Sequence, residues 1–374
     1  MKKTASILLA LCMPFLLSGC WSSEEITTLA IVMGIGVDAA ADGEYEVTVQ
    51  IAQPSNLKFM SGGDNQDAYF NASSTGIGIQ QQMHQFETEL SREIYNGHME
   101  MIVIGKEAAE GGLEQIMDYF YRESEARFNI PIVIADGKAS DLLDVELKLE
   151  RLPVSRLAGM LSTNRVDMVV RKITMDDFLR NAVSNSSATL PIIEQLEEGA
   201  LETKGVAVFD KYKMVGELDQ EQARSMLILT NKYGGGIATI ELPDNGVFTF
   251  EITKSSASVK PECENGELSV NAEVYLEFRV SDVSEIGELY SDEARHNAEK
   301  MVNAAMFERL ADVITRSREL NADVFDFADI IYCRYPRESE SSIKNWDEEF
   351  RNLPVSISVT SKMYSSGAVL KNIQ

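Results

Sequence analysis

One cysteine near the N-terminus, Cys20, has a sequence context that favours modification by lipid. It ends the run Leu17-Ser18-Gly19-Cys20 at the close of a short apolar segment, which is the spacing of a bacterial lipobox. Its thiol can be alkylated to a thioether, and the small Ser18 and Gly19 let the backbone lie extended in a peptidase cleft. The pattern predicts cleavage after Gly19 and an N-palmitoyl, S-diacylglycerol cysteine at position 20.

The residues before Cys20 have the pattern of a secretory signal. Lys2 and Lys3 supply the basic region, and residues 7–17 supply the apolar region. That segment is shorter than the roughly 20 apolar residues of a transmembrane helix. The alternative is an ordinary signal with a chance cysteine, since Cys12 lies within the same apolar region. Agreement at four lipobox positions favours lipidation.

The other motif matches lack the partners that their chemistry requires. Residues 34–39 fit the dinucleotide fingerprint G-x-G-x-x-A, but a second strand is expected next, so no helix N-terminus would hold a pyrophosphate. Gly105-Lys106 resembles the end of a phosphate-binding loop, but Glu107 stands in place of the Ser or Thr that binds magnesium. Two S-x-x-K matches have no S-D-N or K-T-G partner: Ser55–Lys58 and Ser341–Lys344.

No group of side chains has the spacing of a metal site or of a general acid–base pair. The three histidines are scattered along the chain: His84, His98 and His296. Asp323, Asp326 and Asp329 lie three apart, and helix capping by Asp323 with a solvated face is favoured over a functional site. We therefore expect no catalytic, cofactor-binding or metal-ligating residue, and a binding or assembly protein rather than an enzyme.

The charge of the chain restricts its partners. The 374 residues have a net charge of −25, and removing residues 1–19 takes away two lysines, which leaves −27. Nucleic-acid phosphates and anionic lipid headgroups would repel such a body, so nucleic acid is excluded and a lipid anchor is needed to hold the body at a membrane. Of the remaining cysteines, Cys263 and Cys333 allow one disulfide, but two unpaired thiols are favoured because they lie in different expected elements.

The hydrophobic pattern predicts an α+β protein with mostly antiparallel sheets packed against helices, in two or three domains. A hairpin is expected over residues 29–51, a long loop over 54–75 and a linker over 181–189. Further strands are expected at 99–104, 130–135, 206–209, 237–241, 247–253, 256–260, 268–280 and 355–359. Helices are expected at 76–95, 113–120, 138–150, 174–182, 219–231, 291–320, after 321 and at 346–350. We expect the chain to divide into a signal peptide over residues 1–19, an N-terminal region over 20–197 and a C-terminal domain over 198–374, which contains the long helix.

Trp346 and Phe350 are expected to be core residues of an amphipathic helix rather than part of a binding patch. For Trp21, a place at the lipid–water interface and a place on the first domain are equally favoured.

Four sequence blocks, spread over nearly the whole mature chain, agree in type and order with one known family. The blocks are Gly19–Asp38, His98–Lys106 with Asp118–Arg122, Lys204–Gly216, and Asp323–Asp329 with Tyr335-Pro336 and Trp346–Phe350. In these the chain resembles the C-subunit lipoproteins of bacterial spore germinant receptors, the Ger(x)C family. It departs at two positions: Ser22 stands where the family usually has an acidic residue, and Ser339 where Trp is common.

The resemblance implies a lipid-anchored, non-enzymatic subunit of a nutrient germinant receptor, needed for spore germination. It implies the outer face of the spore inner membrane and two integral-membrane receptor subunits as partners. It leaves open whether a small-molecule germinant binds directly. The alternative is a lipid-anchored solute-binding protein of a transporter, but the hairpin at 29–51 argues against its usual parallel-sheet lobes. A lipoprotein hydrolase is the third possibility, and it is disfavoured because the chain lacks the catalytic motifs of hydrolases.

Replacing Cys20 with Ala removes the thiol that would carry the lipid. We expect the Cys20→Ala chain to leave the membrane fraction and to incorporate no labelled palmitate, whereas Cys12→Ala should behave like the wild type. Immunoblots of membrane and soluble fractions, with palmitate labelling, measure both. Unchanged fractionation and labelling of Cys20→Ala would rule out the anchor.

Overall fold

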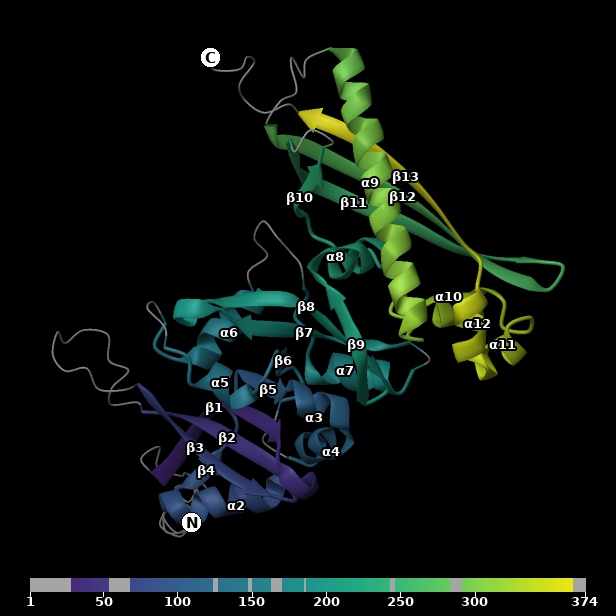
Figure 1. The fold of residues 1–374 in the computed structure, drawn as a ribbon. Coiled ribbons are helices and arrows are strands. Elements are labelled where there is room, and N and C mark those ends of the chain that lie inside the picture. The colour runs from purple at the N-terminus through teal and green to yellow at the C-terminus, as the bar shows by residue number, and fades with distance from the viewer. Residues whose placement is uncertain are drawn as a thin grey trace, which may run out of the picture.

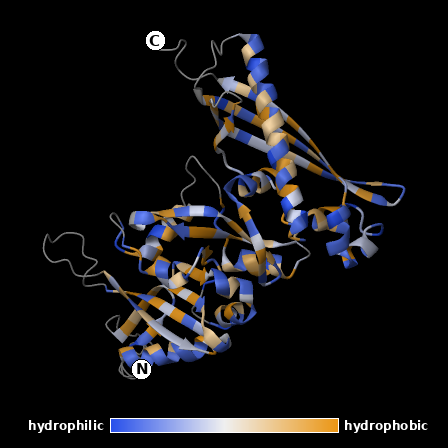
Figure 2. Ribbon diagram, in the orientation of Figure 1, coloured by the Kyte–Doolittle hydropathy of each residue, from blue (hydrophilic) through white to orange (hydrophobic). Residues whose placement is uncertain are grey.

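The strands of the chain form two sheets, and helices cover them (Figure 1). The computed structural model describes residues 28–53, 68–123, 127–146, 150–162, 170–184, 186–242, 246–283 and 291–365. Along the strands of the smaller sheet, hydrophobic and hydrophilic residues alternate (Figure 2). Helices and strands are mixed in both halves, so the α+β class expected from the sequence is confirmed.

The larger sheet has the strand order β3-β2-β1-β5-β6-β7-β8-β9, with β4 beside β1. Its strands are β1 (Leu29–Ala39), β2 (Tyr45–Ala52), β3 (Tyr69–Gly76), β4 (Glu93–Tyr95), β5 (Met101–Gly105), β6 (Ile132–Ala135), β7 (Ala188–Gln195), β8 (Leu201–Asp210) and β9 (Lys213–Asp219). The central run β1-β5-β6-β7 is parallel, and the strands on both flanks pair antiparallel. Every residue of β5 and β6 is buried, as expected for parallel strands covered on both faces.

Helices cover both faces of the larger sheet. They are α2 (Ile79–Leu90), α3 (Lys106–Gly111), α4 (Glu114–Arg122), α5 (Ala139–Leu143), α6 (Pro153–Ser162) and α7 (Met175–Ala182). One core contains residues of α2, α3, α4 and α7, and the other contains residues of α5 and α6. Strand β5 contributes alternate residues to the two cores, Ile102 to the first and Val103 to the second.

The two glycines of the G-x-G-x-x-A match serve packing. A Cβ atom at Gly34 would lie 2.6 Å from Val154 Cγ2, and one at Gly36 would lie 2.9 Å from Leu143 Cδ1. The glycines therefore let α5 and α6 approach β1 closely. A short 3-10 turn (Ala41–Gly43) and then β2 follow, so the expectation that a second strand comes next is confirmed.

The smaller sheet has the order β10-β11-β12-β13, with β12 and β13 parallel and the other pairs antiparallel. Its strands are β10 (Gly236–Glu241), β11 (Val247–Glu264), β12 (Glu267–Val283) and β13 (Val355–Ser365). Every second residue of β12 from Leu268 to Val280 is buried, so one face of this sheet belongs to the core. The helices are α8 (Gln220–Leu229), α9 (Asp292–Glu319), α10 (Phe327–Arg334), α11 (Glu340–Lys344) and α12 (Trp346–Asn352).

Helix α8 lies where the two sheets meet. It contacts β8 and β9 of the larger sheet as well as β11 and α9 of the smaller half (Figure 1). Its N-terminus is closed by a capping box in which Asp219 accepts from the Gln222 backbone N–H at 2.9 Å. Capping by Asp219 was expected from the sequence and is confirmed.

The structure differs from the sequence predictions in several elements. The predicted loop over 54–75 contains a strand, because Tyr69–Gly76 pairs along the edge of the sheet with β2; residues 54–67 lie outside the described part. The predicted helix over 76–95 stops at Leu90, since Ser91 has a left-handed backbone (φ 52°) and β4 follows. Helix α6 was not predicted, and the strands expected at 247–253 and 256–260 are one strand, β11.

The linker predicted over 181–189 is wrong at both ends, because residues 181–182 belong to α7 and residues 188–189 to β7. The expected boundary at 197/198 stays a prediction. Strands β7 and β8, on its two sides, pair antiparallel, with Leu190 opposite Ala207. The larger sheet therefore includes strands from both sides of that position.

Candidate functional site

The residues singled out in the sequence do not meet at one site. Cys20, Ser55 and Lys58 lie outside the described residues, so lipidation stays a prediction. Lys344 on α11 pairs with Glu340 at 2.9 Å rather than with Ser341. The histidines are placed apart: His84 on α2, His98 after β4 and His296 on α9.

The described part of the chain has neither a metal site of three or more ligands nor a helix that could span a membrane. There, no group of three or more His, Cys, Asp or Glu side chains could hold a metal ion. No helix of that part is long and apolar enough to cross a membrane. Cys263 on β11 and Cys333 on α10 are free thiols, as the sequence favoured.

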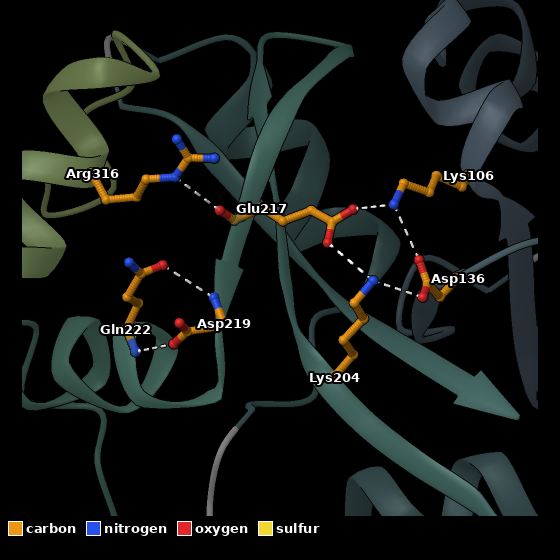
Figure 3. Close-up of polar contacts among 7 residues, drawn as sticks. All are labelled: Lys106, Asp136, Lys204, Glu217, Asp219, Gln222 and Arg316. Atoms are coloured by element: carbon orange, nitrogen blue, oxygen red, sulfur yellow. Dashed lines mark hydrogen bonds and ion pairs between the residues drawn. The ribbon is translucent and has the colours of Figure 1, made fainter. Parts of the chain in front are cut away.

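Lys106 belongs to a cluster of four charged side chains, which we call the junction cluster (Figure 3). Lys106 opens α3, Asp136 follows β6, Lys204 lies on β8 and Glu217 lies on β9. Asp136 accepts a hydrogen bond from each lysine, at 3.1 Å from Lys106 Nζ and 2.7 Å from Lys204 Nζ. Glu217 pairs with both lysines, at 3.6 Å from Lys204 Nζ. The two cations and two anions therefore alternate around a closed ring.

The pKa shifts of Lys106, Asp136 and Lys204 keep these three groups charged. Burial raises the pKa of Asp136, but hydrogen bonds from Lys204 and Lys106 together outweigh it, so this pKa lies below its ordinary value. The hydrogen bond to Glu217 raises the pKa of Lys106 against the effect of burial, and the one to Asp136 raises that of Lys204. Both lysines and Asp136 stay ionised at neutral pH. The cluster thus holds its elements together and is not suited to transfer protons.

Glu217 also connects the junction cluster to the second half of the chain. Its backbone carbonyl accepts a hydrogen bond from Arg316 Nε of α9 at 3.4 Å, and Asp219, two residues later, caps α8 (Figure 3). Strand β9 thereby joins α3 and β6 on one side to α8 and α9 on the other. Sequence reasoning missed Asp136, Lys204 and Glu217 as a group, because four separate elements supply the cluster.

Asp323 is the centre of a second, buried polar arrangement in the C-terminal half. Its side chain is 3% exposed and accepts hydrogen bonds from four N–H groups. These are the backbone N–H of Phe325 (3.1 Å), Phe327 (3.2 Å) and Ala328 (2.8 Å), and Trp346 Nε1 (3.1 Å). Burial raises the pKa of Asp323 to about 6, although the backbone hydrogen bonds act in the opposite direction.

The three aspartates of the 323–329 segment have different surroundings. Capping by Asp323 was expected and is confirmed, since it accepts from the first N–H groups of α10. The prediction of a solvated face is wrong for Asp323, which is buried, and correct for Asp329, which is exposed. Asp326 is half-buried and pairs with Lys232 at 3.6 Å. Trp346 and Phe350 are core residues, as expected. Ser339, at a position of departure from the family pattern, is buried and donates to the Tyr335 carbonyl at 2.6 Å.

Comparison with known proteins matches both halves of the chain to spore germination families. Residues 22–195 match the family model described as "Spore germination protein N-terminal domain", and residues 204–367 the one described as "Spore germination B3/ GerAC like, C-terminal". A relative from Bacillus subtilis (strain 168), "Putative spore germination protein YfkR", is 24% identical over 387 residues, covering 100% of both chains. "Spore germination protein KC" from the same organism is 24% identical over 392 residues, covering 98% of this chain and 96% of its own.

A solved structure shares the fold. It is reported as "Crystal Structure of the GerBC protein" and superposes with a TM-score of 0.61 at 17% sequence identity. The match covers 89% of this chain and 97% of that one. The two chains therefore share their fold.

A double-mutant cycle tests the energetic role of the junction cluster. We expect Lys106→Met and Glu217→Gln to show a coupling of about 1 kcal/mol in the free energy of unfolding, because both side chains are partly buried and share partners. Urea unfolding of the four chains measures it. Lys344→Met with Glu340→Gln, an exposed pair on α11, is the control and should couple less. A coupling in the junction cluster no larger than in the control would contradict this role.

The burial of Asp323 has a consequence for the pH dependence of stability. Because its folded pKa of about 6 exceeds its ordinary 3.8, the native state binds the proton more tightly than the unfolded state. The contribution of Asp323 protonation to the free energy of unfolding is complete below about pH 4 and is lost as the pH rises through 6.

Asn cannot titrate, so the excess stability of the wild type over Asp323→Asn should shrink between pH 5 and 7.5. Urea unfolding of both chains across that range checks this. The other titrating groups are common to the two chains and cancel in the difference. A difference that stays constant with pH would show that the pKa of Asp323 is not shifted, and one that grows with pH would show the opposite shift; both would contradict the prediction.

Proposed function

Because the chain belongs to the Ger(x)C family of spore germination proteins, we propose that it is a lipid-anchored, non-enzymatic subunit of a nutrient germinant receptor. The observation that carries the proposal is the match of two adjoining family models to residues 22–195 and 204–367. Two relatives named as spore germination proteins align over 100% and 96% of their length, so the likeness extends over the whole of each protein rather than over one shared module.

The lipid anchor is supported by the sequence before the first strand. The lipobox ends at Cys20, only nine positions before β1 begins at Leu29, so the folded body would start close to the membrane. An anchor is physically required because a body of this charge is repelled by anionic headgroups. We place the protein on the outer face of the spore inner membrane.

A non-enzymatic role is supported by how the strongest polar groups are used. The ions of the junction cluster are paired with one another, and the Asp323 carboxylate accepts from four N–H groups of its own chain. Groups engaged in this way stabilise the structure and are not poised to attack a substrate. We propose that the protein acts by assembling with two integral-membrane receptor subunits.

Deletion of the gene in its own spore former tests the role. We expect spores without the gene and its paralogues to lose the response to at least one nutrient, measured as the fall in optical density after each nutrient is added. The wild-type gene should restore that response, and Cys20→Ala should restore it poorly because the body would leave the membrane. Normal responses to every nutrient in the deletion strain would refute the receptor role.

A further inference from the structure

An apolar groove with a volume of about 700 Å³ lies between α4 and α7 on the larger half of the molecule. Its apolar lining comes from α4, from the segment after it, from α7 with its C-cap and from the β8–β9 turn: Met117, Tyr121, Phe128, Leu179, Val183 and Tyr212. Neither the junction cluster nor Asp323 contributes to it.

Three of the large hydrophobic side chains in this groove face solvent. Tyr121 is 63% exposed, Phe128 is 45% exposed and Val183 is 77% exposed. The rings of Tyr121 and Phe128 lie 5.7 Å apart. Single exposed hydrophobic residues are ordinary on protein surfaces, but a group of them in one concave site marks a surface that binds something. Aromatic side chains are also the residues that most often dominate binding energy.

The two helices that line the groove, α4 and α7, contribute residues to it with the same spacing. Each helix contributes four positions at the spacing i, i+3, i+4, i+7, which lie on one side of a helix: Glu114, Met117, Asp118 and Tyr121 from α4, and Asp176, Leu179, Arg180 and Val183 from α7. The other sides are buried in the core, at Phe120 and Phe178 for example. Each set of four holds two apolar and two charged positions, and Met117 is itself buried, so the apolar side chains that face the groove from the helices are Tyr121, half-buried Leu179 and Val183. A third helix that lies between α4 and α7 can cover them.

The size of the site limits the occupant. Helix α4 has nine residues, which corresponds to about 13 Å at roughly 1.5 Å per residue. A helix lying along it would make contact over about two and a half turns. That length presents three or four apolar side chains to the groove.

The charges at the rim determine the chemistry of the occupant. The lining includes three carboxylates, Glu114, Asp118 and Asp176, and one guanidinium, Arg180. Arg180 lies 3.0 Å from Asp176, and Arg122, outside the lining, lies 2.9 Å from Asp118. With three carboxylates against one guanidinium, the lining carries a net charge of −2, and an occupant with Lys or Arg beside its apolar stripe is complementary to it.

Two other kinds of occupant fit the charges poorly. An anionic lipid surface would be repelled by the acidic rim. A second copy of this chain would bring another body with a charge of −25. We propose that the groove between α4 and α7 docks one amphipathic α-helix of a partner protein, apolar on the inserted side and flanked by Lys or Arg. This inference stands apart from the proposed germination role, since it rests only on the groove.

Photo-cross-linking of the full-length chain in its own host tests the proposal. The photoreactive residue p-benzoylphenylalanine replaces Tyr121 or Val183 in the groove, and Phe307, 46% exposed on α9, as the control position. We expect Tyr121 and Val183, but not Phe307, to cross-link to the same segment of one other protein. Mass spectrometry should identify a helix with apolar residues at i, i+3, i+4 and i+7 and flanking Lys or Arg.

Every other result overturns the proposal. These results are no adduct specific to the groove positions, an adduct with lipid, an adduct with a second copy, and an adduct with an acidic or extended segment. Circular dichroism melting of each purified chain verifies that these exposed substitutions leave the fold intact.

Charge reversal at the rim tests the complementarity separately. With the photoreactive residue at Val183, Glu114→Lys, Asp118→Lys and Asp176→Lys together should reduce the adduct about tenfold or more, because the rim would then repel a basic helix. Glu110→Lys, at an exposed position of α3 outside the groove, is the matched control and should leave the yield unchanged. Equal yields from the triple variant and the control would contradict a basic occupant.

Discussion

The pairing of Lys106, Asp136, Lys204 and Glu217 holds β9, a strand through which the larger sheet contacts the elements of the smaller half. The side chain of Glu217 contacts the lysines of α3 and β8, while its carbonyl accepts from Arg316 of α9. Two residues further on, the same strand ends at the cap of α8. One short strand, β9, thus sets the positions of elements that belong to both sheets.

The junction cluster is stable because every charge in it has a partner of opposite sign. The four side chains are 19–37% exposed, so water screens them only in part and an unpaired ion there would be costly. Each lysine has two carboxylates within reach, and each carboxylate has two lysines. Asp323 follows the same rule by a different route, since four N–H groups replace the water that its buried carboxylate has lost.

The groove between α4 and α7 contrasts with these satisfied sites. Asp118 and Asp176 on its rim are paired with arginines, but three of its apolar side chains, Tyr121, Phe128 and Val183, are exposed. Exposed apolar area of this kind costs free energy in water, and covering it with another protein recovers that cost. In this molecule the polar clusters hold the chain together, and the uncovered apolar surface is where another protein would bind.

The sequence by itself determined the features that depend on neighbouring residues. These include the hairpin at the start of the chain, the cap of α8, the long helix α9 and the α+β class, because apolar periodicity and capping act over a few residues. The lipobox and the family blocks are also local. The edge strand β3 was missed because its small polar residues carry no strand pattern and are ordered by pairing with β2.

Only the tertiary structure decided which charged and apolar groups meet. Lys106 and Asp136 are 30 positions apart, and Asp136 and Lys204 are 68 apart, so no spacing rule connects them. The depth of Asp323 and the groove between α4 and α7 likewise depend on which helix covers which face. Burial and ion pairing are set by neighbours in space, and only the packed sheets bring those neighbours together.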